Sequence, residues 1–141
     1  MKSLHILLLC YFIVGGEFAF FKQGLSVKGK LLCNNKPANN EIVKLFDLDR
    51  NPGDDDDLMD EVLSDQKGLF LVDGSTHEFT TIEGVVRIYT DCNDGIRPCM
   101  RMIEVPVPVS YIYHKKATKT FDIGQIDLFY RFEKETRSCD Y

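Results

Sequence analysis

The sequence predicts an all-β fold, a two-layer sandwich of about seven or eight short strands, and three observations support this prediction. Helical periodicity is weak throughout the 141 residues. Short apolar runs alternate with clusters of glycine, proline, asparagine and aspartate, which is typical of strands separated by turns. Four cysteines beyond the N-terminal segment could hold a small domain together with disulfide bonds. A closed barrel is the alternative architecture.

Five strands are expected in the first two thirds of the chain, each bounded by turn residues. They are Leu25–Cys33, Ile42–Asp47, Leu58–Ser64, Leu69–Val72 and Val85–Thr90. Because the run Leu69–Val72 is continuously apolar, it predicts a strand that is buried on both faces or lies near the centre of a sheet.

The remaining expected strands are Met100–Val105, Lys119–Ile123 and Gln125–Phe132. Pro106 and Pro108 end the first of these, because proline cannot donate a hydrogen bond to a central strand. Gly124 separates the other two. A short helix is expected around Ser75–Ile82 or nowhere.

The N-terminus predicts secretion. Met1 and Lys2 precede an apolar run of about 11 residues, which suits a signal peptide and is too short to span a bilayer. Cleavage is expected after Gly16, with Ala19 as the later alternative. Residues 1–16 would then be the signal peptide and 17–141 a single domain, and no later segment predicts a membrane span.

The net charge of −5 argues against nucleic acid as the main partner. Four cysteines remain once Cys10 is removed with the signal peptide, and an even number in a secreted chain indicates two disulfides, with three possible pairings. No cysteines stand in a C-x-x-C pair, and His77 and His114 lie far from them in sequence, so no zinc site and no cofactor is predicted.

Several local patterns resemble one family when their order and spacing are taken together. They are Gly29-x-Leu31-x-Cys33, Asp65-x-x-Gly68-x-Phe70-x-Val72-x-Gly74, Ile88-Tyr89-x-x-Cys92, Cys99-x-Arg101 and Phe121-Asp122-Ile123-Gly124. The chain thereby resembles the nematode transthyretin-like proteins over roughly Val27–Cys139. This resemblance implies a transthyretin-like (immunoglobulin-like) sandwich of two sheets, a location outside the cell or at its surface, and a binding role toward lipids, small hydrophobic molecules or partner proteins.

Two better-defined relatives share that fold, and neither activity is expected here. The related hydroxyisourate hydrolase uses histidine and arginine residues and ends in Tyr-Arg-Gly-Ser, whereas this chain ends in Arg137–Tyr141 and has no histidine in its first predicted strand. Ser75, His77 and Glu78 are too close in sequence to form a hydrolytic trio, because adjacent strand residues point apart. No enzymatic activity is therefore predicted, and hormone transport by transthyretin is not carried over either.

For the disulfides we predict Cys33–Cys92, which would join the ends of two strands, and Cys99–Cys139, which would hold a polar C-terminal tail. The alternative pairing, Cys92–Cys99 with Cys33–Cys139, stays open.

The candidate contact region is a group of aromatic and basic residues late in the chain: Tyr111, Tyr113, His114, Lys115, Lys116 and Lys119. Exposed aromatic rings beside a basic cluster could bind an extracellular partner protein or an anionic lipid surface. Alternatively, the tyrosines pack on the sandwich and the lysines lie in water. A different function, carriage of a small hydrophobic ligand within or between subunits, is the second hypothesis, and oligomerisation is possible.

The acidic run Asp54–Asp57 is expected to be a solvated loop between strands. A weak calcium site over residues 54–61 is the alternative, since calcium needs several converging oxygen ligands. An EF-hand is excluded, because Pro52 stands where that loop requires glycine.

Overall fold

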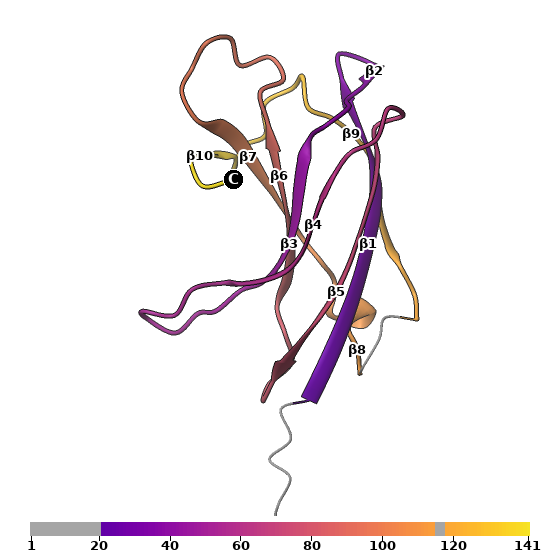
Figure 1. Ribbon diagram of the computed structural model, residues 1–141, viewed down its shortest axis with the longest axis vertical. Helices are drawn as coiled ribbons and strands as arrows, with labels where there is room; N and C mark the ends of the chain where they lie inside the picture. Colours follow the sequence, from indigo (N-terminus) through magenta and orange to yellow (C-terminus); the bar gives the residue numbers. More distant parts are fainter. Residues whose placement is uncertain (1–20, 115–117) are drawn as a thin grey trace, which may run out of the picture.

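The computed structural model describes residues 21–114 and 118–141, and these form a sandwich of two β-sheets (Figure 1). Sheet A contains β1 (Phe21–Cys33), β2 (Lys36–Pro37), β5 (Leu69–Glu78), β8 (Tyr113–His114) and β9 (Phe121–Asp127). Sheet B contains β10 (Thr136–Ser138), β7 (Met100–Pro106), β6 (Gly84–Thr90), β3 (Ile42–Asp47) and β4 (Asp57–Leu63), in this spatial order. The predicted all-β sandwich is confirmed, whereas the predicted signal peptide lies outside the described residues.

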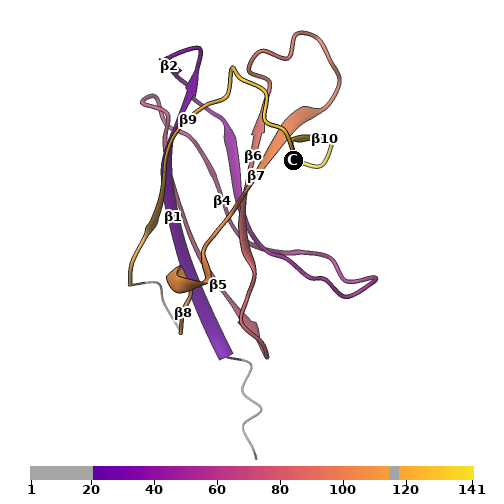
Figure 2. The ribbon, with the colours of Figure 1, turned by 180° about the vertical axis from the view of Figure 1, so that it is seen from behind.

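Sheet A is built around β1. On one edge β1 pairs with β5 in antiparallel fashion, and on the other it pairs with β9 in parallel and with the short β8 (Figure 2). The only helix in the described ranges is η1 (Val109–Tyr111), a single 3₁₀ turn between β7 and β8. None of the described residues belongs to a helix long and apolar enough to cross a membrane.

The core lies between the two sheets and follows the two-residue period of the strands. Alternate residues of β3 are buried, and β6, in the middle of sheet B, is buried along almost its whole length. Apolar side chains of five strands belong to this core: Leu25, Val27, Leu31, Val43, Leu45, Phe70, Val72, Val86, Ile88 and Ile103.

The prediction that Leu69–Val72 is buried on both faces is wrong. The strand lies at an edge of sheet A, and only Phe70 and Val72 face the core. Leu69 and Leu71 point outward and are 45% and 55% exposed. The strand also continues to Glu78 through its ladder with β1, so no helix forms over Ser75–Ile82.

The predicted strands Lys119–Ile123 and Gln125–Phe132 are in fact one strand, β9, which passes through Gly124. Gly124 has a φ of 77°, and the pairing with β1 shifts register there, which is a β-bulge. The strand ends at Asp127, whose carboxylate accepts backbone N–H bonds from the turn that follows β1 (Asn34 and Asn35) and from Phe129.

Two disulfides stabilise the end of the sandwich that is uppermost in Figure 1. Cys33–Cys92 joins the end of β1 in sheet A to the loop after β6 in sheet B, and Cys99–Cys139 joins the start of β7 to the C-terminal segment. This is the pairing favoured from the sequence rather than the alternative one.

A buried arginine lies beside these disulfides. Arg101 on β7 is 1% exposed and donates hydrogen bonds to the backbone oxygens of Cys92, Leu128 and Tyr130, at 2.8, 2.5 and 2.8 Å. Its guanidinium also contacts both carboxylate oxygens of Glu135, at 2.9 and 2.7 Å. One side chain thus connects β7, the loop after β6 and the segment after β9.

Candidate functional site

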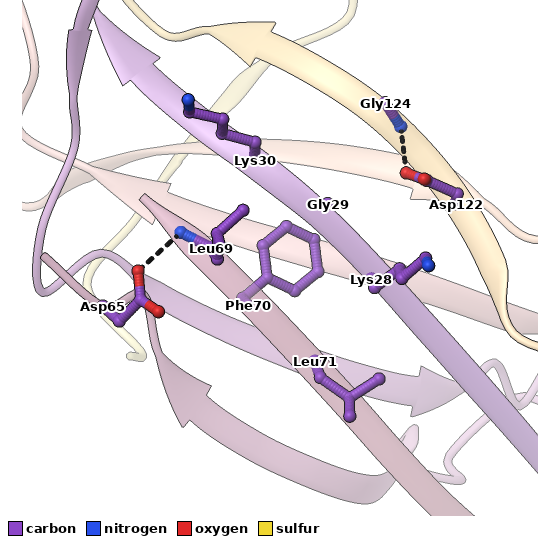
Figure 3. Close-up of a pocket in the computed structure, with 9 residues that line it drawn as sticks. All are labelled: Lys28, Gly29, Lys30, Asp65, Leu69, Phe70, Leu71, Asp122 and Gly124. Atoms are coloured by element: carbon purple, nitrogen blue, oxygen red, sulfur yellow. Dashed lines mark hydrogen bonds between the residues drawn. The ribbon is translucent and has the colours of Figure 1, made fainter. Parts of the chain in front are cut away.

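The outer face of sheet A carries apolar side chains on one strand beside basic side chains on the next. In the β1–β5 ladder Lys28 lies opposite Leu71 and Lys30 lies opposite Leu69. Such cross-strand neighbours have Cβ atoms about 5 Å apart. The face is hollowed by a concavity of about 530 Å³ (Figure 3), lined by Lys28, Gly29, Lys30, Asp65, Leu69, Phe70, Leu71, Asp122 and Gly124.

On the core side of β1, side chains pack closely around Gly29. Gly29 lies opposite Phe70 in the ladder, and the phenyl ring rests beside the glycine (Figure 3). A Cβ atom on Gly29 would lie 2.5 Å from Cγ1 of Ile123 and 2.9 Å from a ring carbon of Phe70. The glycine therefore lets both side chains fill the core beneath β1, while Leu69 and Leu71 alternate to the outside.

Two lysines and two aspartates line the concavity, and the two kinds of charged group differ in their partners. The carboxylate of Asp65 accepts the backbone N–H groups of Lys67 and Leu69, both at 2.9 Å, and that of Asp122 accepts the N–H of Gly124 at 2.8 Å (Figure 3). Both acids thus stabilise local backbone turns. By contrast, neither of the two lysines in this concavity has an ion-pair partner among residues 21–114 and 118–141.

The sequence-predicted contact region borders the same sheet. Tyr111 is half-buried in η1, where its ring packs on Phe121 with ring centroids 4.9 Å apart, and the ammonium of Lys119 lies 5.1 Å from the Tyr111 ring. Tyr113 and His114 form β8 and pair with Gly24 and Gln23 of β1. Lys115 and Lys116 fall outside the described residues.

The ring of Tyr111 therefore packs on the sandwich, which was the alternative to a contact role for this tyrosine. A contact role for Tyr113, His114 and Lys119 stays a prediction. Sequence reasoning missed Leu69 and Leu71, because a short apolar run carries no sign of which face is solvated. The signal was present further along the chain: Asp73, Ser75 and His77 continue the outward-facing positions of β5 with polar side chains.

No hydrolytic trio forms on β5. Ser75 and His77 share the exposed positions of the strand, and Glu78 falls on the opposite face. This agrees with the sequence argument against such a trio.

The acidic residues between the sheets form a second cluster. Carboxylate oxygens of Asp47, Asp57 and Glu78 lie within 4.8 Å of one another. Burial raises the pKa of Asp47, although its carboxylate accepts the N–H of Glu83 at 2.9 Å. Burial, and then a hydrogen bond to Asp57, raises the pKa of Glu78. The ionised forms of Asp47 and Glu78 are therefore disfavoured in the folded chain.

The acidic loop before this cluster is only partly solvated. Asp54 and Asp55 are exposed, as expected. Asp56 instead pairs with Arg87 at 2.8 Å and accepts the N–H of Asp49 at 2.9 Å, so it anchors the loop to sheet B.

We expect Glu78→Gln to raise the melting temperature at pH 7. The folded-state pKa of Glu78 is raised, mainly by burial, so its ionisation destabilises the fold above that pKa, and the neutral glutamine removes that cost. The gain should vanish as pH falls below the ordinary glutamate pKa of about 4.3, where Glu78 is protonated in both states. Thermal unfolding at pH 7 and pH 3.5 in a chelating buffer measures this. Glu133→Gln, at an exposed glutamate, controls for net charge, and an equal gain in that variant would contradict the explanation.

Two packed β-sheets, joined by one disulfide and with a second at the C-terminus, define a transthyretin-type β-sandwich domain. The chain belongs to the transthyretin-like family: the TTR-52 transthyretin-like family matches residues 28–108. The resemblance noted in the sequence is thus confirmed.

The similarity extends over whole proteins. The chain is 42% identical to transthyretin-like protein 33 of Caenorhabditis elegans over 135 residues, which cover 95% of this chain and 92% of that protein. It is also 42% identical to transthyretin-like protein 5 of the same organism over 137 residues, 95% of this chain and 96% of the relative. Neither name denotes an enzyme.

A solved 9R-lipoxygenase from Cyanothece also matches, with a TM-score of 0.41 and 22% identity over 76% of this chain and 17% of that one. The chain spans about a sixth of the lipoxygenase, and at this level of similarity the match supports no argument about function.

Proposed function

We propose that the protein is a secreted, non-catalytic binding protein that uses the outer face of sheet A to engage a partner outside the cell, either a protein or a cell-surface lipid. The observation that carries this proposal is the pairing of half-exposed Leu69 and Leu71 with Lys28 and Lys30 around one concavity. Contiguous exposed apolar surface bordered by charge is typical of interaction sites. Two disulfides and family membership support an extracellular location.

The chemistry of the concavity supports binding rather than catalysis. Its polar side chains are two lysines and two aspartates, and both aspartates accept backbone hydrogen bonds. No serine, cysteine or histidine belongs to the lining, so it offers no nucleophile paired with a general base.

A carrier of a small hydrophobic ligand is the second candidate function. The volume of about 530 Å³ is in the range of small-molecule sites, which is roughly 300–1,000 Å³. Such sites usually cover most of the ligand surface, however, and the two leucines of this concavity remain half exposed. The open geometry therefore favours a ligand or partner group that stays partly exposed to water over one that is fully enclosed.

Binding of the purified, disulfide-bonded protein to dissociated C. elegans cells tests the proposal by flow cytometry. We expect Leu69→Ser/Leu71→Ser to reduce binding about tenfold, since it removes the apolar contact surface. The matched control is Leu58→Ser/Leu63→Ser on β4, whose leucines are 53% and 57% exposed and belong to sheet B.

Full binding by the sheet A variant, or equal loss in the control variant, would exclude this face. A third variant, Tyr113→Ser/Lys119→Gln, examines the β8–β9 margin that the sequence suggested. Loss of binding in that variant alone would mean that the partner contacts the β8–β9 margin and not Leu69 and Leu71.

A further inference from the structure

We propose that the concavity on the outer face of sheet A binds a single-chain carboxylate amphiphile, with its alkyl chain over Leu69 and Leu71 and its carboxylate between Lys28 and Lys30. This inference rests on the proposed use of the same face for binding and names the chemistry of one ligand.

The apolar half of the site is a column on β5. Leu69 and Leu71 are two residues apart on one face, which places them about 7 Å from each other along the strand. Each exposes about half of its side chain to water, so covering both is favourable. Because the column is one strand wide, it suits one alkyl chain lying along β5.

The charged half is the parallel column on β1. Lys28 and Lys30 are also about 7 Å apart on that face. Their side chains point apart in Figure 3, and rotation about the flexible lysine bonds brings both ammonium groups to an anion between them. A strand spacing of about 4.8 Å places that anion directly beside the apolar column. The two like charges repel each other, and an anion between them relieves this repulsion.

Within residues 21–114 and 118–141, no acidic side chain forms an ion pair with Lys28 or Lys30. Asp65 and Asp122 line the concavity, but their carboxylates accept the N–H groups of Leu69 and Gly124. The ion pairs of the described residues use other lysines and arginines. The lining as a whole, with two lysines and two aspartates, has no net formal charge, but the two ammonium groups have no ion-pair partner among the described residues.

The donor set favours a carboxylate over a phosphate. Phosphate is commonly recognised by arginine forks or by several backbone N–H groups that point at the ligand. The lining contains no arginine. At the β-bulge the N–H of Gly124 donates to Asp122, so it does not point at a ligand. Two lysines act as separate point charges and provide no planar fork for the oxygens of a phosphate.

The chain has no tryptophan whose fluorescence could report binding, so the leucine methyl groups serve as the probe. Titration of the oxidised protein with monomeric dodecanoate, followed by NMR of these methyl groups, tests the proposal. We expect the methyl signals of Leu69 and Leu71 to shift, and dodecyltrimethylammonium, with the same chain and opposite charge, to cause no comparable shift. Dodecyl phosphate should bind more weakly than dodecanoate, and tighter binding of the phosphate would overturn the assigned head group.

Variants then separate the two columns. Lys28→Gln/Lys30→Gln should weaken dodecanoate binding about tenfold, whereas Lys36→Gln/Lys134→Gln, which changes the net charge equally at two exposed lysines elsewhere, should leave it unchanged. Equal binding by the first variant, or equal affinity for the cationic amphiphile, would overturn the proposal.

The outcome is distinguishable from failure of the proposed function. If dodecanoate does not bind while cell-surface binding still depends on Leu69 and Leu71, only the ligand class is wrong. If neither binding depends on these leucines, the assignment of the face itself is wrong.

Discussion

Arg101→Met should lower the free energy of unfolding by about 3–5 kcal/mol, the usual cost of removing one partner of a buried ion pair. Methionine keeps much of the side-chain length but loses every donor. The backbone oxygens of Cys92, Leu128 and Tyr130 then lose a hydrogen bond inside the protein, and Glu135 loses its cation. Each buried oxygen left without a partner adds to the cost.

Urea denaturation of the oxidised protein at pH 7 measures this loss. The control is Arg50→Met: Arg50 also pairs with a glutamate, Glu83, but its side chain is 73% exposed. Exposed pairs contribute about 0–1 kcal/mol, so the control should change little. A loss below 1 kcal/mol for Arg101→Met would show that the buried network is not a main source of stability.

The same pair predicts a pH dependence. Hydrogen bonds from Arg101 lower the pKa of Glu135, with burial acting in the opposite direction. The stabilisation is therefore complete above the ordinary glutamate pKa of about 4.3 and is lost as pH falls through the lowered folded-state pKa. In Arg101→Met this acid-dependent loss should shrink, because the cation that lowers the pKa is gone. An unchanged pH profile would contradict this link.

Cys33→Ala/Cys92→Ala is the second large effect, with an expected loss of about 4 kcal/mol. The bond closes a loop with a sequence separation of 59 residues, and the chain-entropy model gives about this value for such a loop. Cys92 is also buried in the core, and the bond joins sheet A to sheet B, so its removal acts on the whole sandwich.

Cys99→Ala/Cys139→Ala is the comparison that separates loop entropy from position. Its sequence separation is 40, and the entropic term alone would be almost as large. This bond holds a terminal segment, however, and that segment retains the Arg137–Asp94 pair at 2.7 and 2.9 Å. We expect local fraying and a smaller global loss by urea denaturation. Equal losses would mean that position has no influence.

Local sequence determined most of the strands. The alternation in Ile42–Asp47 predicted β3 with the bounds that the structure has. Asn34 and Asn35 directly follow the predicted strand Leu25–Cys33, and their φ values of 52° and 64° are those that a two-residue hairpin turn requires. These features depend on a few neighbouring residues, so they are visible in the sequence alone.

The errors concern features that depend on distant neighbours. The run Leu69–Val72 has the pattern of a strand buried on both faces, but no layer of the described residues covers the outer face of β5, so Leu69 and Leu71 are half exposed. In Gln125–Phe132 the alternation suggested one strand, yet Asp127 binds the turn after β1 and ends β9. Both outcomes follow from contacts with segments far away in the sequence.

The sequence by itself determined the fold class, the number of cysteines available for disulfides and the resemblance to the transthyretin-like family. The tertiary structure decided which strands lie at sheet edges, that Arg101 is buried among backbone oxygens, and that Lys28 and Lys30 lie beside Leu69 and Leu71. The physical reason is that a two-residue period fixes which residues share a face of one strand, whereas the neighbours of that face are chosen by pairing between distant strands. The candidate site is a property of that pairing.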